Sequence, residues 1–198
     1  GMLDKARRIL DREIPPMDRG RMERFVGSLI KYADMFAELR SELGSPLYVV
    51  DEGGIKRDLA RLGNAFQALP GEVEIYYAMK SNNMHEIVTA VVEEGAGLDV
   101  SSGLELRQAV ESGARSIVFS GPGKTEAELS TALDHADRVT LMIDSFGELD
   151  RIDRLTKQRD IMVRAGVRLT TRPDGLWRRF GISIDRLGDF MSKAESCP

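Results

Sequence analysis

A lysine at the end of a short apolar run is the residue whose position most directly suggests chemistry. The segment 74–83 reads as a buried strand that ends on Lys80, immediately before a helix cap at Asn83. In folds built from alternating strands and helices, the carboxyl ends of the strands face the active site. Desolvation there lowers the pKa of a lysine amine, which can then act as a nucleophile and form a Schiff base. A lysine that extends its amine into water is the structural alternative.

Two carboxylates and an arginine occupy comparable places farther along the chain. Asp99 lies near the end of the next predicted strand, where it could balance charge, orient a cofactor or simply face water. Glu105 falls in the first turn of the following helix, and its spacing from Ser102 is that of a capping box, which explains it without catalysis. Arg164 lies inside an apolar strand, where a lone arginine is costly unless it is paired or faces a site.

The glycine-rich segment 119–125 looks at first like a phosphate-binding loop. However, Val118 stands where such a loop has its first glycine, so a tight turn capped by Thr125 is the better interpretation. ATP binding is therefore not expected.

Composition narrows the class of protein. The 198 residues are 42% hydrophobic and 30% charged with a net charge of −4, which predicts one soluble globular domain and argues against nucleic-acid binding. One cysteine and two histidines predict neither an internal disulfide nor a metal site. No apolar run approaches the roughly 20 residues of a membrane span, and no signal peptide is evident. A cytoplasmic protein without membrane contact is expected.

The elements that must position these residues form a repeat. The pattern of apolar residues predicts two helices within residues 2–43, separated at 14–16. A short strand is predicted at 47–50, followed by a helix from the cap Asp51 to about Leu69. Further strands are predicted to start near Val73, Gly97, Ser116, Arg138 and Ile161, in steps of 24, 19, 22 and 23 residues. Capping-box spacing marks four helix starts, pairing Asn83 with Glu86, Ser102 with Glu105, Thr125 with Glu128 and Ser145 with Glu148. Gly95 and Gly113 fall at helix ends. This βα repeat predicts parallel strands, in either an eight-stranded barrel or an open doubly wound sheet.

Several ordered motifs resemble one family, the fold-type III pyridoxal-phosphate enzymes, and within it the diaminopimelate, ornithine and arginine decarboxylase group, relatives of alanine racemase. The segment 76–82 resembles the cofactor-lysine motif, with Met79 and Ser81 where the family usually has Val and Ala. The other matching segments, in chain order, are 45–51, 97–106, 119–125, and Arg164 followed sixteen residues later by 180–182. Together the motifs cover about residues 45–185.

The resemblance implies an α/β fold, a (β/α)8 TIM-like barrel of the alanine racemase type. The barrel would be incomplete, with about five barrel strands in residues 46–198 after a helical N-terminal extension at 1–45. It implies that Lys80 forms the internal aldimine with pyridoxal 5′-phosphate and that Asp99, Glu105 and Arg164 surround this cofactor. We expect Lys80, Asp99 and Arg164 at one rim of the sheet.

The implied activity is decarboxylation of a small-molecule substrate, an amino acid of the diaminopimelate or ornithine type, by a full-length homodimer. In this family a ring-stacking histidine, a glycine-rich phosphate loop, an acidic residue and a partner-subunit cysteine motif follow the matched region. Five strands cannot close an eight-stranded barrel. We therefore expect these 198 residues to be an N-terminal portion, inactive alone, whose strand at 47–50 belongs to a second, β-rich domain.

Two alternatives stay open. A racemase of the same fold needs a base on each face of the cofactor ring. A noncatalytic homologue or fragment would instead bind a partner through its strand edges. The turn at 121–124 and the helical lead-in favour the decarboxylase, and the presence of Lys80 counts against an inactive homologue of the intact protein.

Overall fold

The computed structural model describes residues 18–171 and 180–197, and the chain divides into two compact units, Gly1–Val49 and Val50–Pro198. The first predicted helix and the break at 14–16 lie outside the described residues. Among the residues described, no helix combines the length and the apolar composition that a bilayer crossing demands.

The first unit contains two described helices, α2 (Arg19–Ile30) and α3 (Ala33–Leu43). The sequence predicted one continuous helix here, but the chain turns at residues 31–32 before α3 begins. Gly44 then ends α3 with a φ of 87°, a left-handed conformation that glycine adopts at little cost.

The predicted strand at residues 47–50 is wrong for the described structure. These residues have no strand partner and Tyr48 is 87% exposed. A β-branched and aromatic run has strand propensity, but a strand forms only where a neighbouring strand offers hydrogen bonds.

The second unit begins with α4 and continues as the predicted repeat. Asp51 caps α4 (Glu52–Phe66), since its side chain accepts a hydrogen bond from the amide of Gly54. The elements that build the sheet and its cover follow in the order β1 (Tyr76–Ala78), η1 (Met79–Ser81), α5 (His85–Glu93), β2 (Gly97–Val100), α6 (Gly103–Glu111), β3 (Ile117–Phe119), α7 (Glu126–Leu133), β4 (Val139–Ile143), α8 (Phe146–Arg159) and β5 (Arg164–Val167).

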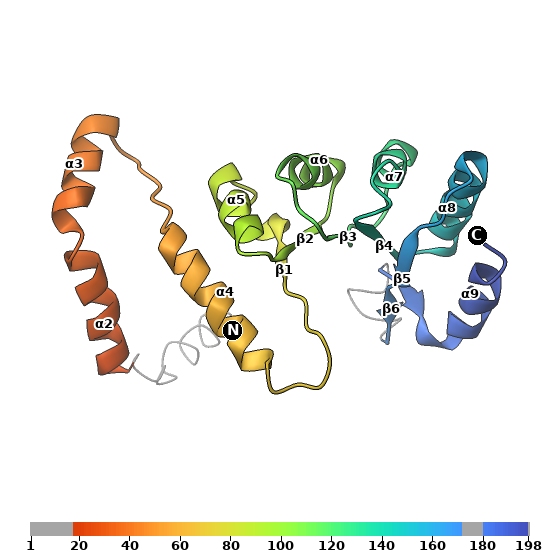
Figure 1. Ribbon diagram of the computed structural model, residues 1–198, viewed down its shortest axis with the longest axis horizontal. Coiled ribbons are helices and arrows are strands. Elements are labelled where there is room, and N and C mark those ends of the chain that lie inside the picture. The colour runs from red at the N-terminus through yellow and green to blue at the C-terminus, as the bar shows by residue number, and fades with distance from the viewer. Residues whose placement is uncertain (1–17, 172–179, 198) are drawn as a thin grey trace, which may run out of the picture. The chain divides into compact units, whose positions relative to one another are not determined.

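The five strands form one parallel sheet in the order β1-β2-β3-β4-β5. The helices α5, α6, α7 and α8 lie along the same side of this sheet (Figure 1). A doubly wound sheet would reverse its strand order and place helices on both faces. Sequential order and one-sided helices are those of a barrel, so the unit is an incomplete (β/α) barrel, as the resemblance implied.

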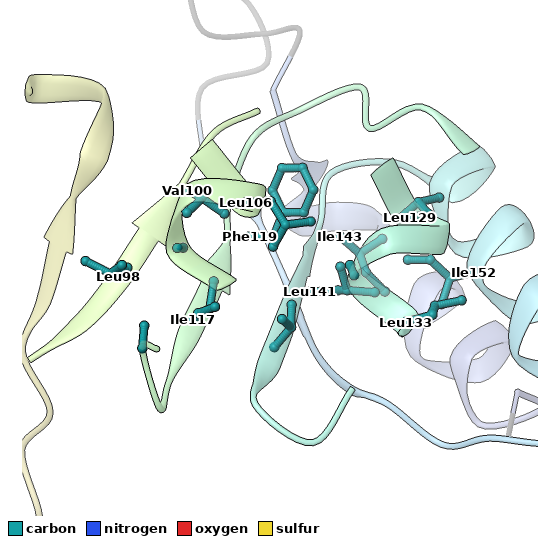
Figure 2. Packing of buried hydrophobic residues seen from close by; sticks show 14 of the residues in the cluster. Leu98, Val100, Leu106, Ile117, Phe119, Leu129, Leu133, Leu141, Ile143 and Ile152 are labelled. Atoms are coloured by element: carbon teal, nitrogen blue, oxygen red, sulfur yellow. The ribbon is translucent and has the colours of Figure 1, made fainter. Parts of the chain in front are cut away.

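The core lies between the sheet and its helices. Alternate strand residues face it, and Leu98, Val100, Ile117 and Phe119 are at most 1% exposed. They meet apolar side chains of the covering helices, such as Leu106, Leu129 and Ile152 (Figure 2). The residues between them, including Asp99, Val118 and Thr140, point to the opposite face of the sheet.

The last described elements pack at the β5 end of this unit. They are β6 (Leu169–Thr170), β7 (Ile182–Ser183), η2 (Ile184–Arg186) and α9 (Leu187–Ala194). β6 and β7 pair in parallel, and Phe190 of α9 is buried, with its ring 5.6 Å from that of Phe146.

The four predicted capping boxes have different outcomes. Only the box of Thr125 with Glu128 is complete. Ser102 and Ser145 cap α6 and α8 through their hydroxyls, whereas the cap expected at Asn83 is wrong, because α5 begins after Met84. The predicted left-handed glycines are confirmed, with φ values of 82° at Gly95 and 77° at Gly113.

Candidate functional site

Lys80 lies just past the carboxyl end of β1, as the strand pattern predicted. It belongs to η1, in which Met79 is 1% exposed and anchors the turn in the core. The hydroxyl of Ser81 donates to the carbonyl of Ala78 at 2.7 Å and closes this turn. The Lys80 side chain is exposed, and its amine makes no hydrogen bond or ion pair with another described residue. A fixed backbone therefore presents an accessible amine.

Asp99 lies on the neighbouring strand. Its Cα is paired with that of Ala78, two residues before Lys80, so the side chains of Asp99 and Ala78 share the sheet face that the helices leave open. The Oδ1 atom of Asp99 has almost no exposed surface and no hydrogen-bond partner among the described residues. A buried carboxylate oxygen in this condition costs free energy until a donor reaches it. The position therefore suits a ligand that brings a proton or a positive charge.

Glu105 is held by the loop that follows Asp99. Its Oε2 accepts a hydrogen bond from the amide of Ser101 at 2.7 Å, and its own amide donates to the hydroxyl of Ser102 at 3.3 Å. The glutamate thus secures the start of α6. It lies close in sequence to Asp99, but its carboxylate is engaged by the protein backbone.

Arg164 does not join Lys80 at the carboxyl rim. It is the first residue of β5, and its guanidinium donates at 2.7 Å to the carbonyl of Asp137, which precedes β4. The guanidinium is therefore directed toward the amino ends of the strands, so the expectation of one rim shared by Lys80, Asp99 and Arg164 is wrong on this point. The reason is the register, because Arg164 pairs with Thr140 at the beginning of β4.

The glycine-rich turn at 119–125 directs its lysine inward. Lys124 is 2% exposed, and its amine donates at 2.6 Å both to Oε1 of Glu148 and to the carbonyl of Met142. The amine also lies 5.1 Å from the ring centroid of Phe119. A lysine fixed in this way cannot reach out to a nucleotide phosphate, in keeping with the rejection of a phosphate loop.

Two acidic residues that the sequence suggested only as helix caps also link neighbouring loops. Glu148 receives Lys124 from the preceding βα unit, and Glu128 accepts from the amide of Gly103, 25 residues earlier. Their capping spacing was the only signal in the sequence, and it identifies a partner three residues away rather than one on another helix.

Some of the amide groups at the starts of α6 and α7 are engaged by acidic side chains of the protein itself. Glu105 accepts from the amide of Ser101, and Glu128 accepts from the amides of Gly103 and Thr125. No group of three histidine, cysteine, aspartate or glutamate side chains within residues 18–171 and 180–197 could hold a metal ion.

Comparison with known proteins decides the family. Residues 52–196 match the model of the pyridoxal binding domain of pyridoxal-dependent decarboxylases. The chain belongs to this family. Pyridoxal phosphate, the cofactor that the motifs implied, is thereby confirmed as the cofactor of the family.

Individual relatives agree with this assignment. The chain is 34% identical over 135 residues to a diaminopimelate decarboxylase of Bacillus methanolicus, with 67% of this chain and 31% of the relative covered. It is 30% identical over 178 residues to that of Vibrio cholerae, with 82% and 41% covered. A crystal structure of diaminopimelate decarboxylase from M. jannaschii with L-lysine superimposes with a TM-score of 0.73 at 28% identity, covering 81% of this chain and 41% of that one. The chain thus spans about a third to two fifths of these relatives.

The residues at the carboxyl rim fit a pyridoxal cofactor. The aldehyde of the cofactor requires an accessible amine, which Lys80 provides. A polar group of the cofactor ring can donate a hydrogen bond to a carboxylate oxygen such as the unpartnered Oδ1 of Asp99.

Proposed function

We propose that this protein, in its full natural length, catalyses the pyridoxal-phosphate-dependent decarboxylation of an amino acid of the diaminopimelate or ornithine type, with Lys80 as the residue that attaches the cofactor. One observation carries the proposal. Lys80 presents an accessible amine at the carboxyl end of β1, next to a strand whose Asp99 has a buried, unpartnered oxygen, within a segment that matches a pyridoxal binding domain.

The residues have distinct parts in this proposal. A bound pyridoxal group supplies an electron sink for the carbanion left by loss of carbon dioxide. Lys80 holds the cofactor, Asp99 balances charge beside it, and Glu105 fixes the loop after Asp99. For Arg164 to act as a cofactor residue, its guanidinium has to leave the carbonyl of Asp137.

The test uses the full-length protein with pyridoxal phosphate and, separately, diaminopimelate, ornithine and arginine. Carbon dioxide release should appear with at least one of them, be lost in Lys80→Ala and persist in Lys157→Ala, whose exposed lysine pairs with Asp153 on α8. Interconversion of enantiomers without carbon dioxide would favour the racemase instead. A protein that binds the cofactor but converts no amino acid would favour the noncatalytic homologue.

The same proposal includes the assembly and the behaviour of the isolated chain. We propose a homodimer for the full-length protein, supported by the family motifs, and light scattering tests it. We also propose that residues 1–198 alone are inactive, because the relatives are more than twice as long and the described sheet has two open edges. Assays of both lengths under identical conditions decide this point.

A further inference from the structure

One carboxylate, that of Glu128, joins two successive loops at the carboxyl rim. Its Oε1 accepts from the amide of Gly103, the first residue of α6, at 2.6 Å. Its Oε2 accepts from both the amide and the hydroxyl of Thr125, each at 2.8 Å, at the start of α7. Three donors from two loops therefore converge on one carboxylate. In its ionised form this group has no proton to donate, so it acts only as an acceptor.

The contact with Gly103 is not needed to cap α7. The capping box is complete with Oε2 and the amide of Glu128, which donates to the hydroxyl of Thr125. Oε1 is free to serve another loop, and Gly103 approaches it so closely that an added Cβ would lie 2.7 Å from Cγ of Glu128. Oε1 of Glu128 thus has a separate function, which is to hold the start of α6 through the amide of Gly103.

The loop that Glu128 holds is the one that follows Asp99. On its other side, this loop rests on the β3–α7 turn, since an added Cβ on Gly121 would lie 2.1 Å from the carbonyl oxygen of Ser101. The amide of Ser120 donates to the carbonyl of Val100 at 2.9 Å. The loop 101–102, which joins Asp99 on β2 to Glu105 on α6, is therefore fixed to the next βα unit rather than only to its own helix.

A further hydrogen bond links α6 to the loop of Lys80. The amide nitrogen of the Asn83 side chain donates to the side-chain oxygen of Gln108 at 3.1 Å, which joins the segment after Lys80 to α6. The contacts thus run from the Lys80 loop through α6 to Glu128. A shift of the start of α6 would move Glu105 relative to Lys80, whereas Asp99 stays in β2 through its pairing with β1 and β3.

We infer that Glu128 is a positioning residue, which sets the place of Glu105 and of the loop 101–102 relative to the cofactor attached at Lys80 by holding the start of α6. This inference rests on the proposed function. Glu128 itself touches no reacting atom. Glu128 acts through its hydrogen bond with the amide of Gly103. The three donors require an ionised carboxylate at the end of a side chain as long as that of glutamate.

The experiment compares Glu128→Gln with two controls in the full-length protein. The glutamine keeps the length of the side chain but places an NH2 group against an N–H donor at one of the two loops. Thr125→Ala removes the hydroxyl of the cap and leaves the contact between Gly103 and Oε1. Glu126→Gln alters an exposed carboxylate in the same turn, which pairs with Arg154.

Two readouts separate positioning from capping. Hydrogen exchange of the cofactor-free protein should be faster at residues 101–106 in Glu128→Gln and unchanged there in both controls. Cofactor affinity, measured from the fraction of Lys80 labelled after borohydride reduction, should fall about tenfold, which corresponds to a loss of about 1.4 kcal/mol of binding free energy. Both controls should retain the affinity of the original protein, even if Thr125→Ala lowers the melting temperature.

The outcomes distinguish this inference from the proposed function. Unchanged cofactor affinity in Glu128→Gln, with Lys80 labelled in the original protein, overturns the inference alone. An unlabelled Lys80 in the original protein overturns the proposed function. It also overturns the inference that Glu128 positions residues around the cofactor. If Glu128→Gln does not fold, Gly103→Ala displaces the Glu128 side chain without removing its charge, and loss of affinity in this variant supports the inference while full affinity contradicts it.

Discussion

Lys124 and Glu148 form an ion pair at 2.6 Å in which neither side chain has any exposed surface. The lysine comes from the turn after β3 and the glutamate from the first turn of α8, so the pair ties two successive βα units together. The second carboxylate oxygen of Glu148 is buried without a partner among the described residues. Removal of one charge therefore leaves the other in a site that solvates it poorly.

We expect Lys124→Ala to lower the free energy of unfolding by about 3–5 kcal/mol, because an uncompensated carboxylate remains buried. The double variant Lys124→Met with Glu148→Leu should recover most of this loss, since apolar side chains of similar volume remove both desolvation penalties. Urea unfolding at pH 7 measures both. Lys157→Ala, in the solvent-exposed pair on α8, should leave the midpoint unchanged. A double variant as unstable as Lys124→Ala would show that packing, not the unpaired charge, is responsible.

Acid should weaken the fold partly through Glu128. Burial alone would raise the pKa of this carboxyl, but hydrogen bonds from Thr125 and Gly103, with the charge of Lys124, outweigh burial and hold the pKa below its ordinary value of 4.5. A lowered pKa in the folded state stabilises the protein above pH 4.5, and this contribution is lost as the pH falls through the folded value. The stability difference between the original protein and Glu128→Gln should therefore shrink below pH 4.5. Parallel curves from urea unfolding between pH 6 and pH 3 would contradict this expectation.

The close approach of Gly121 to Ser101 predicts an asymmetry among alanine substitutions. Gly121→Ala should destabilise the fold by about 1–3 kcal/mol or more, because its Cβ would lie 2.1 Å from a backbone oxygen that can move only with the loop. Gly103→Ala should cost less, since the neighbouring atoms belong to the Glu128 side chain, which can rotate away with the loss of its hydrogen bonds, and not to the backbone. Gly147→Ala, in a helix where the added Cβ would meet only the Arg151 side chain at 4.0 Å, should be neutral or stabilising. Thermal unfolding ranks the three, and a harmless Gly121→Ala would refute the described contact.

The sequence predicted the repeated elements well because their signals are local. The predicted strand starts at Gly97, Ser116 and Arg138 fall within one residue of β2, β3 and β4. The starts near Val73 and Ile161 were each three residues early, because an apolar run shows where a strand is compatible but not where its neighbour begins to pair. The same limitation explains the wrong strand at 47–50, which has local propensity but no partner in the described structure.

The site was predictable in part. The place of Lys80 at a strand end follows from periodicity, and its expected role came from the family motif. The direction of Arg164 depends on the register between β4 and β5, which no local pattern encodes. Glu128 and Glu148 were recognised only as caps, because their second partners lie 25 and 24 residues away along the chain.

Attachment of the cofactor at Lys80 is the central claim, and mapping the attachment residue tests it most directly. The full-length protein is loaded with pyridoxal phosphate, reduced with borohydride, digested and analysed by mass spectrometry, in parallel with residues 1–198, Lys80→Ala and Lys157→Ala. We predict label on Lys80 in the full-length protein and in Lys157→Ala, weak label in residues 1–198, and none at this position in Lys80→Ala. An intact, cofactor-loaded protein whose Lys80 carries no label would contradict the account.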